Sequence, residues 1–273
     1  MAKLLTEEQI ERYHNEGGIA PIRIMSDDEA GELRRKFEAL EEEIGGEAQG
    51  RFRIKAHLPF PWLTEVIHNS TMLDAVEDLI GPDIVVWGSS FFTKKARDQR
   101  FVSWHQDSTY YGLEPAESMT AWIAFSDSTK ESGCMRILPG SHKGESVLRH
   151  VETFDPDNLL ARGQTIEGVD ESHTVDLEVR AGEMSIHHNK TVHSSMPNPS
   201  DAPRIGFAVH IAPSYVRQTQ FDGATATLVR GEDPESNWAP DITARKDFDP
   251  DCLEALDHAW QNYRKYMKAP YED

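Results

Sequence analysis

The feature that most constrains this chain is a change in its hydrophobic period near residue 83. Before it, apolar residues recur at helical spacing. After it come short segments rich in β-branched and aromatic residues, separated by Gly, Pro, Asp and Ser. These segments are residues 83–94, 101–107, 118–127, 133–141, 174–182, 182–188 and 204–212. Strands in succession, mostly without helices between them, predict an antiparallel sandwich or barrel of the jelly-roll kind, mainly β with flanking helices.

Capping signals predict three helices before residue 83. The first two begin at capping boxes, the second ends at a Gly-Gly pair, and the third begins after a serine and ends at a Gly-Pro pair. The residues are Thr6 with Gln9, Ser26 with Glu29, Gly45-Gly46, Ser70 and Gly81-Pro82. We expect these helices to serve as scaffold.

A helical period returns after Pro250, and no linker composition separates the three parts of the chain. The apolar face of this last helix is predicted to comprise Leu253, Leu256, Trp260, Tyr263 and Met267. We therefore expect one domain over residues 1–273. Within it, 1–82 would be a mostly helical buttress, 83–215 the jelly-roll core, and 216–273 a C-terminal extension with a helix.

Charge and cysteine content narrow the classes of partner. The chain has 28 Lys and Arg against 47 Asp and Glu, a formal charge of −19, which repels nucleic acid and anionic membranes. Two cysteines cannot form a disulfide framework, and the sequence shows neither a signal peptide nor an apolar run of membrane length. We expect a cytoplasmic monomer or homodimer without nucleic-acid or membrane partners.

The chemistry of the chain centres on the segment Trp104-His105-Gln106-Asp107. Residues i and i+2 of a strand point to the same side, so the His105 imidazole and the Asp107 carboxylate can converge on one metal ion. A two-His, one-carboxylate triad holds iron(II) and leaves coordination positions open. The third ligand should come from a later strand, and His193 is our choice. The competing histidines are His187, His188 and His210.

Arg204 favours His193 over its competitors. It lies eleven residues beyond His193, and a short turn through residues 196–200 would return the chain so that Arg204 lies beside it. The planar guanidinium fork of arginine binds carboxylates in bidentate fashion. A metal with open positions and an arginine placed for a carboxylate match the requirements of 2-oxoglutarate.

Four segments of the chain resemble the phytanoyl-CoA dioxygenase family of iron(II)/2-oxoglutarate oxygenases, in the order of that family. They are Trp104-His105-Gln106-Asp107, residues 121–125, Glu131 to Arg136 running into Pro139-Gly140-Ser141-His142, and His193-Ser194-Ser195 through Pro197-Asn198 to Arg204. The resemblance covers nearly the whole chain and implies the double-stranded β-helix, a cupin-like jelly roll.

The resemblance also implies residue roles. His105, Asp107 and His193 would bind iron, Arg204 would pair with the distal carboxylate of 2-oxoglutarate, and Ser195 would assist it. Further positions that would line or contact the cosubstrate site are Gln106, Trp122, Ser90 and Lys55. Trp122 could equally be a core aromatic residue of a barrel strand.

These residues predict a dioxygenase that uses Fe(II), 2-oxoglutarate and O2 to hydroxylate a small molecule. Halogenases of this fold have a small residue in place of the carboxylate, so Asp107 favours hydroxylation. Residues that could face the substrate are Tyr110, Tyr111, His57 and Arg217. Three alternatives stay open: a hydroxylase of acyl-CoA or carrier-bound acyl groups, a non-catalytic metal- or ligand-binding jelly roll, and a zinc hydrolase.

Overall fold

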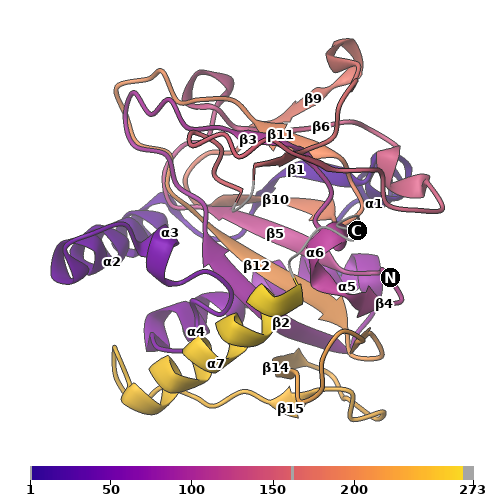
Figure 1. Cartoon of the computed structure of the whole chain (residues 1–273). Helices are drawn as coiled ribbons and strands as arrows, with labels where there is room; N and C mark the ends of the chain where they lie inside the picture. Colours follow the sequence, from indigo (N-terminus) through magenta and orange to yellow (C-terminus); the bar gives the residue numbers. More distant parts are fainter. Residues whose placement is uncertain (1, 161–162, 267–273) are drawn as a thin grey trace.

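Two sheets face each other in the computed structural model of the chain, which describes residues 2–160 and 163–266 (Figure 1). The large sheet has the order β1-β10-β5-β12-β2-β14-β15, and the small sheet has the order β3-β11-β6-β9. All neighbouring strands are antiparallel except β14 and β15. The sheets stay open at their edges, and the predicted jelly roll with flanking helices is confirmed.

The strands have the following bounds. The large sheet comprises β1 (Gly18–Arg23), β2 (Ile84–Phe91), β5 (Met119–Ala124), β10 (Glu183–His188), β12 (Gly206–Pro213), β14 (Thr225–Arg230) and β15 (Ala239–Pro240). The small sheet comprises β3 (Val102–His105), β6 (Met135–Ile137), β9 (Val175–Leu177) and β11 (His193–Ser195). Two small ribbons pair β4 (Leu113–Glu114) with β13 (Arg217–Gln218), and β7 (Val151–Glu152) with β8 (Gln164–Thr165).

Side chains of the large sheet alternate between two environments. In β5, Met119, Ala121 and Ile123 belong to the main hydrophobic core, whereas Thr120 and Trp122 line a cavity on the opposite face. Strands β10 and β12 repeat this pattern. The period of two therefore directs apolar side chains toward the helices and polar ones toward the small sheet.

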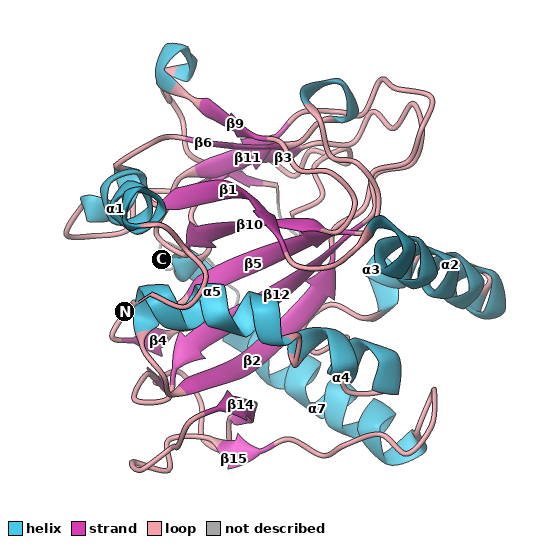
Figure 2. Ribbon diagram, turned by 180° about the vertical axis from the view of Figure 1, so that it is seen from behind, coloured by secondary structure: helices cyan, strands magenta, loops and turns pink. Residues whose placement is uncertain are grey.

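Helices cover the apolar face of the large sheet, and Figure 2 shows α5 lying across it. Their bounds are α1 (Glu7–Glu16), α2 (Asp27–Ile44), α3 (Ala48–Arg51), α4 (Pro61–Ile67), α5 (Ser70–Ile80), α6 (Ser108–Tyr111) and α7 (Pro250–Tyr266). Single 3-10 turns occupy Lys130–Ser132, Ser141–Lys143 and Glu171–His173. Among the described residues, no helix is both long and apolar enough to cross a membrane.

The predicted helix boundaries agree with the structure. The hydroxyls of Thr6 and Ser26 accept the predicted capping bonds at the start of α1 and α2, and α2 ends at Gly45. The third helix, α5, is capped by the Asn69 side chain and ends before Gly81. In α7, Leu256 and Tyr263 are buried as expected; Met267 lies outside the described residues.

The large sheet also draws strands from both sides of the predicted core. Strand β1 pairs with β10, although residues 1–82 were expected to be mostly helical. Gly18 and Pro21 are poor strand formers, and their presence hides β1 in the sequence. At the other boundary, β14 pairs with β2, so part of the C-terminal extension belongs to the sheet.

Candidate active site

Three side chains from β3, the start of α6 and β11 converge between the sheets. His105 and His193 are directly paired residues of neighbouring strands, and their ring centroids are 4.0 Å apart. Asp107 follows β3 in helical conformation, and its Oδ1 lies 3.4 Å from His105 Nε2 and 3.9 Å from His193 Nε2. The three ligand atoms lie within 4.8 Å of one another. The predicted convergence is therefore present, although Asp107 reaches it from a helical turn.

Backbone contacts set the tautomers of both histidines. Nδ1 of His105 donates to the Ser103 carbonyl, and Nδ1 of His193 donates to the Thr191 carbonyl, each at 2.9 Å. A proton on Nδ1 leaves the lone pair on Nε2, the atom that faces Asp107. This is the arrangement by which proteins orient imidazole for a metal.

The second oxygen of Asp107 is held by two further groups. Its Oδ2 lies 3.4 Å from His187 Nε2 and accepts a hydrogen bond from the Thr120 hydroxyl at 3.4 Å. The Thr120 oxygen lies 3.0 Å from His210 Nδ1, and the other ring nitrogen of His210 lies 3.3 Å from the Ser90 hydroxyl. Burial lowers the pKa of His210 to about 4, which keeps that ring neutral.

The same surroundings keep Asp107 ionised. Burial alone would raise the pKa of its carboxyl, but His193, His105 and His187 hold that pKa well below its usual range. Burial also holds the pKa of His193 well below the ordinary value for histidine. An ionised carboxylate is the form that metal ligation requires.

The structure separates the competing histidines. His187 and His210 line the same cavity as the triad, where His187 contacts Asp107 directly and His210 does so through Thr120. His188 points away from the cavity and lies near His142, with ring centroids 5.5 Å apart. The geometric metal cluster found among the described residues is the predicted set of His105, Asp107 and His193.

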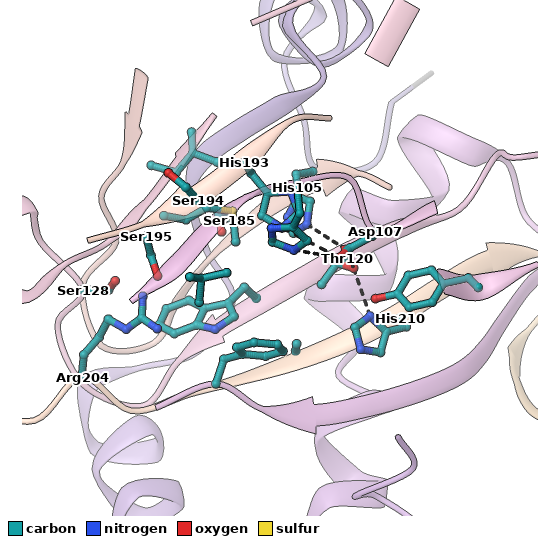
Figure 3. Close-up of a pocket in the computed structure, with 18 residues that line it drawn as sticks. His105, Asp107, Thr120, Ser128, Ser185, His193, Ser194, Ser195, Arg204 and His210 are labelled. Carbon is teal, nitrogen blue, oxygen red and sulfur yellow. Dashed lines mark hydrogen bonds and ion pairs between the residues drawn. The ribbon is translucent and has the colours of Figure 1, made fainter. Parts of the chain in front are cut away.

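A cavity between the two sheets runs from this triad to Arg204. It spans about 580 Å³, including space open to solvent, with the triad at one end and Arg204 at the other (Figure 3). The small sheet contributes Ser195 to its wall, and the large sheet contributes Trp122 and Ser185. Arg204 therefore shares a cavity with His193, but at the far end and not directly beside it.

Arg204 is a buried cation without an anionic partner. Its side chain is only 3% exposed, Nη1 donates to the Gly133 carbonyl at 2.8 Å, and Nε has no hydrogen-bond partner. Within residues 2–160 and 163–266, no carboxylate forms an ion pair with it. Burial lowers its pKa to about 10, so it remains charged at neutral pH. A buried charge left unpaired is costly, and the site therefore fits a ligand that brings an anion.

Two glycines create the space around Arg204. Its guanidinium lies 5.2 Å from the Trp122 ring centroid. A Cβ at Gly206 would come within 1.9 Å of the Trp122 indole, so the strand needs glycine there. Gly133 has φ +70°, and a Cβ on it would collide with the Met196 carbonyl. These contacts explain why glycine stands at both positions.

Lys94 is a site residue that the sequence did not reveal. It is fully buried, and its Nζ donates to Ser195 Oγ at 2.7 Å and to the Met196 carbonyl. Burial and the nearby charge of Arg204 lower its pKa to about 6. Lys94 begins a basic stretch that also contains Lys95 and Arg97, a pattern typical of a solvated surface. That pattern gives no indication that Lys94 is buried.

The other predicted residues divide between the cavities and the protein interior. Trp122 and Ser195 line the cavity of Arg204, and Ser90, Tyr110 and Tyr111 line a second cavity described below. The pKa of Tyr111 is raised by burial, so its hydroxyl is neutral.

Four predicted residues line neither of these two cavities. Gln106 is bonded to the Lys190 carbonyl and the Leu148 amide, and so ties two loops together. Arg217 is exposed and lies 3.8 Å from Glu114.

Lys55 and His57, the other two, belong to a separate buried network. Lys55 Nζ donates to Asp241 at 2.9 Å and to the Thr225 carbonyl at 2.9 Å. His57 Nδ1 lies 2.7 Å from Ser89 Oγ, and its Nε2 lies 3.5 Å from Asp241. Burial favours the neutral acid at Asp241, but Lys55 and His57 hold the pKa of that carboxyl below its usual range. This position does not support the expected contacts of Lys55 with 2-oxoglutarate or of His57 with substrate.

A second, wider cavity opens on the other side of the triad. It encloses about 1650 Å³, including space open to solvent, and shares His105, Asp107, Tyr111 and His210 with the first cavity. Its outer wall contains Arg53 and residues of α7. Nearly all residues that line the first cavity are buried, so it is called the closed cavity, whereas the second has exposed residues such as Arg53 and Arg264 in its wall and is called the open cavity. The triad lies where the two meet.

Comparison with protein families gives one match that covers most of the chain. The model of the phytanoyl-CoA dioxygenase family matches residues 2–206. A probable alpha-ketoglutarate-dependent hypophosphite dioxygenase of Stutzerimonas stutzeri is 29% identical over 157 residues, which cover 56% of this chain and 54% of that protein. A phytanoyl-CoA dioxygenase of Arabidopsis thaliana is 31% identical over 110 residues, 40% of this chain and 38% of the relative. The chain thus spans about half the length, or less, of these curated relatives.

Solved structures match over a greater length. The non-heme monooxygenase ThoJ, in its apo form, superposes with a TM-score of 0.83 at 30% identity, covering 95% of this chain and 97% of ThoJ. CytC3 with Fe(II) and alpha-ketoglutarate has a TM-score of 0.65 at 22% identity, with 90% and 96% of the two chains covered. At that identity, the likeness to CytC3 establishes the shared fold.

Proposed function

The chain belongs to the phytanoyl-CoA dioxygenase family, and from this premise we propose that it is an iron(II)- and 2-oxoglutarate-dependent dioxygenase that hydroxylates an unactivated C–H bond of a small organic molecule. One observation carries the proposal. A closed cavity has two histidines and one carboxylate at one end and an unpaired buried arginine at the other. A molecule that chelates a metal and has a distant carboxylate matches both ends.

The residues present fit both groups. Two imidazoles held through Nδ1, with their Nε2 atoms directed at Asp107, and one ionised carboxylate form the facial triad typical of non-heme iron(II). In our proposal His105, Asp107 and His193 hold the metal. The unpartnered Nε and charge of Arg204 fit the distal carboxylate of 2-oxoglutarate.

When bound, iron(II) with 2-oxoglutarate and dioxygen supplies the oxidising power for C–H hydroxylation, with succinate and carbon dioxide as products. The protein residues bind and orient. Arg204 and the Ser195 hydroxyl position the cosubstrate, with Trp122 packed against the guanidinium. Thr120 and His187 keep the Asp107 carboxylate from rotating. The closed cavity excludes water from the cosubstrate, and the open one leaves room for the substrate.

The open cavity supports a free small molecule as substrate. Its lining includes the aromatic side chains of Tyr110 and Tyr111, and that of Trp260 in the outer wall, which suit a compact organic molecule.

The first test is spectroscopic. Anaerobic addition of iron(II) and 2-oxoglutarate to metal-free protein should produce a weak visible charge-transfer band. Asp107→Ala should lower substrate-stimulated succinate release by more than the roughly 10–100-fold that loss of an outer-shell partner costs. His188→Ala is the matched control, because His188 points away from the cavity.

A metabolite library screened for succinate release tests the reaction. A zinc hydrolase would turn over without oxygen and 2-oxoglutarate, and a non-catalytic protein would bind metal without releasing succinate. Either result, or unchanged turnover in Asp107→Ala, contradicts the proposal.

A further inference from the structure

The open cavity differs in charge from the rest of this acidic protein. Two arginines, Arg53 and Arg264, line it, and its one acidic lining residue is Asp107, a proposed metal ligand. The chain as a whole has 47 acidic residues against 28 Lys and Arg. With Asp107 committed to the metal, the described residues leave no acidic side chain in the cavity wall to neutralise the two guanidinium groups.

Neither arginine is neutralised within the described part of the chain. Arg53 donates from Nε to the Gly50 carbonyl at 2.9 Å, and no ion pair with a described carboxylate is present for Arg53 or Arg264. Arg100, which lines an adjoining cavity, shows the contrast, since Glu47 and Asp98 both pair with it at 2.7 Å. The two guanidinium groups of the open cavity are therefore available to a ligand.

Aromatic packing orients this pair. The Arg53 guanidinium lies 5.4 Å from the Trp260 ring centroid, and Arg264 follows Trp260 by four residues on α7, so both project from one side of the helix. A guanidinium whose face rests on an aromatic ring keeps N–H groups at its edge for an acceptor. Such a fork matches carboxylate and phosphate oxygens.

We infer that the substrate is an organic anion, whose acidic group binds between Arg53 and Arg264 while its apolar body lies along Trp260 and Tyr110 toward Asp107. The inference rests on the proposed function, because that function makes the Asp107 end the site of oxidation. A protein of formal charge −19 repels anions on average, and a local cationic entrance overcomes that repulsion. Carboxylates, phosphates and sulfonates share the chemistry that this pair recognises.

The C-terminal extension is central to this inference. Trp260 and Arg264 lie beyond residue 206, where the match to the family model ends. The substrate class therefore depends on a segment that family membership does not describe. The buried pair of Lys55 with Asp241 ties the chain segment ahead of α7 to the core.

The test uses two dyes that differ in one charged group: 8-anilinonaphthalene-1-sulfonate and the uncharged N-phenyl-1-naphthylamine. Protein loaded with iron(II) and 2-oxoglutarate under anaerobic conditions is titrated with each, and binding is followed by dye fluorescence. We expect the sulfonate to bind at least about fivefold more tightly, with a preference that declines as salt is added. The double variant Arg53→Gln/Arg264→Gln should abolish the preference.

Arg34→Gln is the matched control, because it removes one positive charge from the exposed face of α2, where Arg34 pairs with Glu38. It should retain the preference for the sulfonate. Equal affinity for the two dyes, no binding of either, or a preference that survives in the double variant would overturn the inference.

The charge-transfer band keeps this result separate from the proposed function. If the charge-transfer band forms but the protein does not prefer the sulfonate, only the inferred substrate class is overturned. If the protein prefers the sulfonate but no band forms, only the assignment as an oxygenase is overturned. As a second arm, a library of carboxylic acids and phosphate monoesters with their neutral esters and parent alcohols distinguishes the acid types by succinate release.

Discussion

The two cavities that meet at the triad are built in different ways. The closed one lies between the sheets, and its key residues Trp122, His193 and Arg204 fall within the family match. The open one includes strand residues near the triad, but its outer wall contains residues of α7, and of these Trp260 and Arg264 come from beyond that match. In our proposal the closed cavity holds the cosubstrate and the open one holds the substrate.

This contrast has a physical basis. Strands hold side chains in fixed register, as the direct pairing of His105 with His193 shows. Helix termini and loops tolerate changes in sequence without loss of the core. Residues that must hold a metal in precise geometry are therefore best placed on strands between the sheets. Residues that recognise a variable substrate are best placed on loops and helices at the entrance.

The largest expected effect concerns the buried ion pair of Lys55 with Asp241, which holds the segment ahead of α7 against the core. Asp241→Asn would leave Lys55 buried without its carboxylate partner, which should lower the free energy of unfolding by about 3–5 kcal/mol. Urea denaturation measures the loss. The control Asp201→Asn removes an exposed ion pair with Arg97 and should cost at most about 1 kcal/mol. Equal losses of unfolding free energy in both variants would show that the buried ion pair stabilises the fold no more than an exposed one.

The next effect concerns the closed cavity. Arg204→Gln should weaken 2-oxoglutarate binding by about 2–5 kcal/mol, because it removes one partner of a buried charge pair. The KM for 2-oxoglutarate should therefore rise by about 30-fold to several thousand-fold. Arg204→Lys keeps the positive charge but lacks the planar guanidinium fork, so its KM for 2-oxoglutarate should lie between those of Arg204→Gln and the wild type. An unchanged KM in Arg204→Gln would mean that the cosubstrate is anchored elsewhere.

A smaller effect concerns the pH dependence of stability. Burial and Arg204 lower the pKa of Lys94 from 10.5 to about 6, so between these values the unfolded chain binds a proton that the folded protein does not. Wild-type stability should accordingly rise with pH in this window by roughly 1 kcal/mol per unit from this group, and Lys94→Met should remove that slope. The comparison requires denaturation midpoints at several pH values between 7 and 9.

Lys95→Met is the control for this slope, because Lys95 is exposed and pairs with Glu47. It should retain the wild-type dependence of stability on pH. A Lys94→Met variant whose slope equals that of wild type would show that Lys94 is charged in the folded protein.

The smallest expected effect concerns Arg217. From the sequence we predicted that it faces the substrate, whereas the structure places it outside both cavities and near Glu114. Arg217→Gln should therefore change the substrate KM by less than about twofold, as expected for an exposed ion pair. A large increase would restore its proposed role in substrate binding.

Much of the sheet architecture could be predicted because it depends on local patterns. The segments around His105 and Trp122 are short and rich in β-branched and aromatic residues, and the capping boxes at Thr6 and Ser26 mark helix starts within four residues. Strand β1 was missed because its sequence has little strand propensity and it is held by pairing with β10, which is distant in the chain.

The candidate site was predicted less completely than the fold, because polar side chains such as Lys55 bind partners that are distant in the sequence. The triad could be proposed because His105 and Asp107 are close in sequence and because Arg204, eleven residues beyond His193, favoured that histidine over its competitors; the resemblance implied the same residues. Lys55 was expected at the cosubstrate but pairs with Asp241, 186 residues away. A pattern of residue types shows that a lysine is present, and only its long-range neighbours decide what it binds.

The sequence by itself determined the family, the jelly-roll class and a candidate set of metal ligands, since these depend on periodicity and on short motifs. The tertiary structure alone decided that Arg204 lies across a cavity from the triad, that Lys94 is buried beside Ser195, and that α7 contributes to the entrance. The physical reason is that burial and charge pairing depend on the neighbours in space of each side chain. Those neighbours are brought together by packing between distant segments.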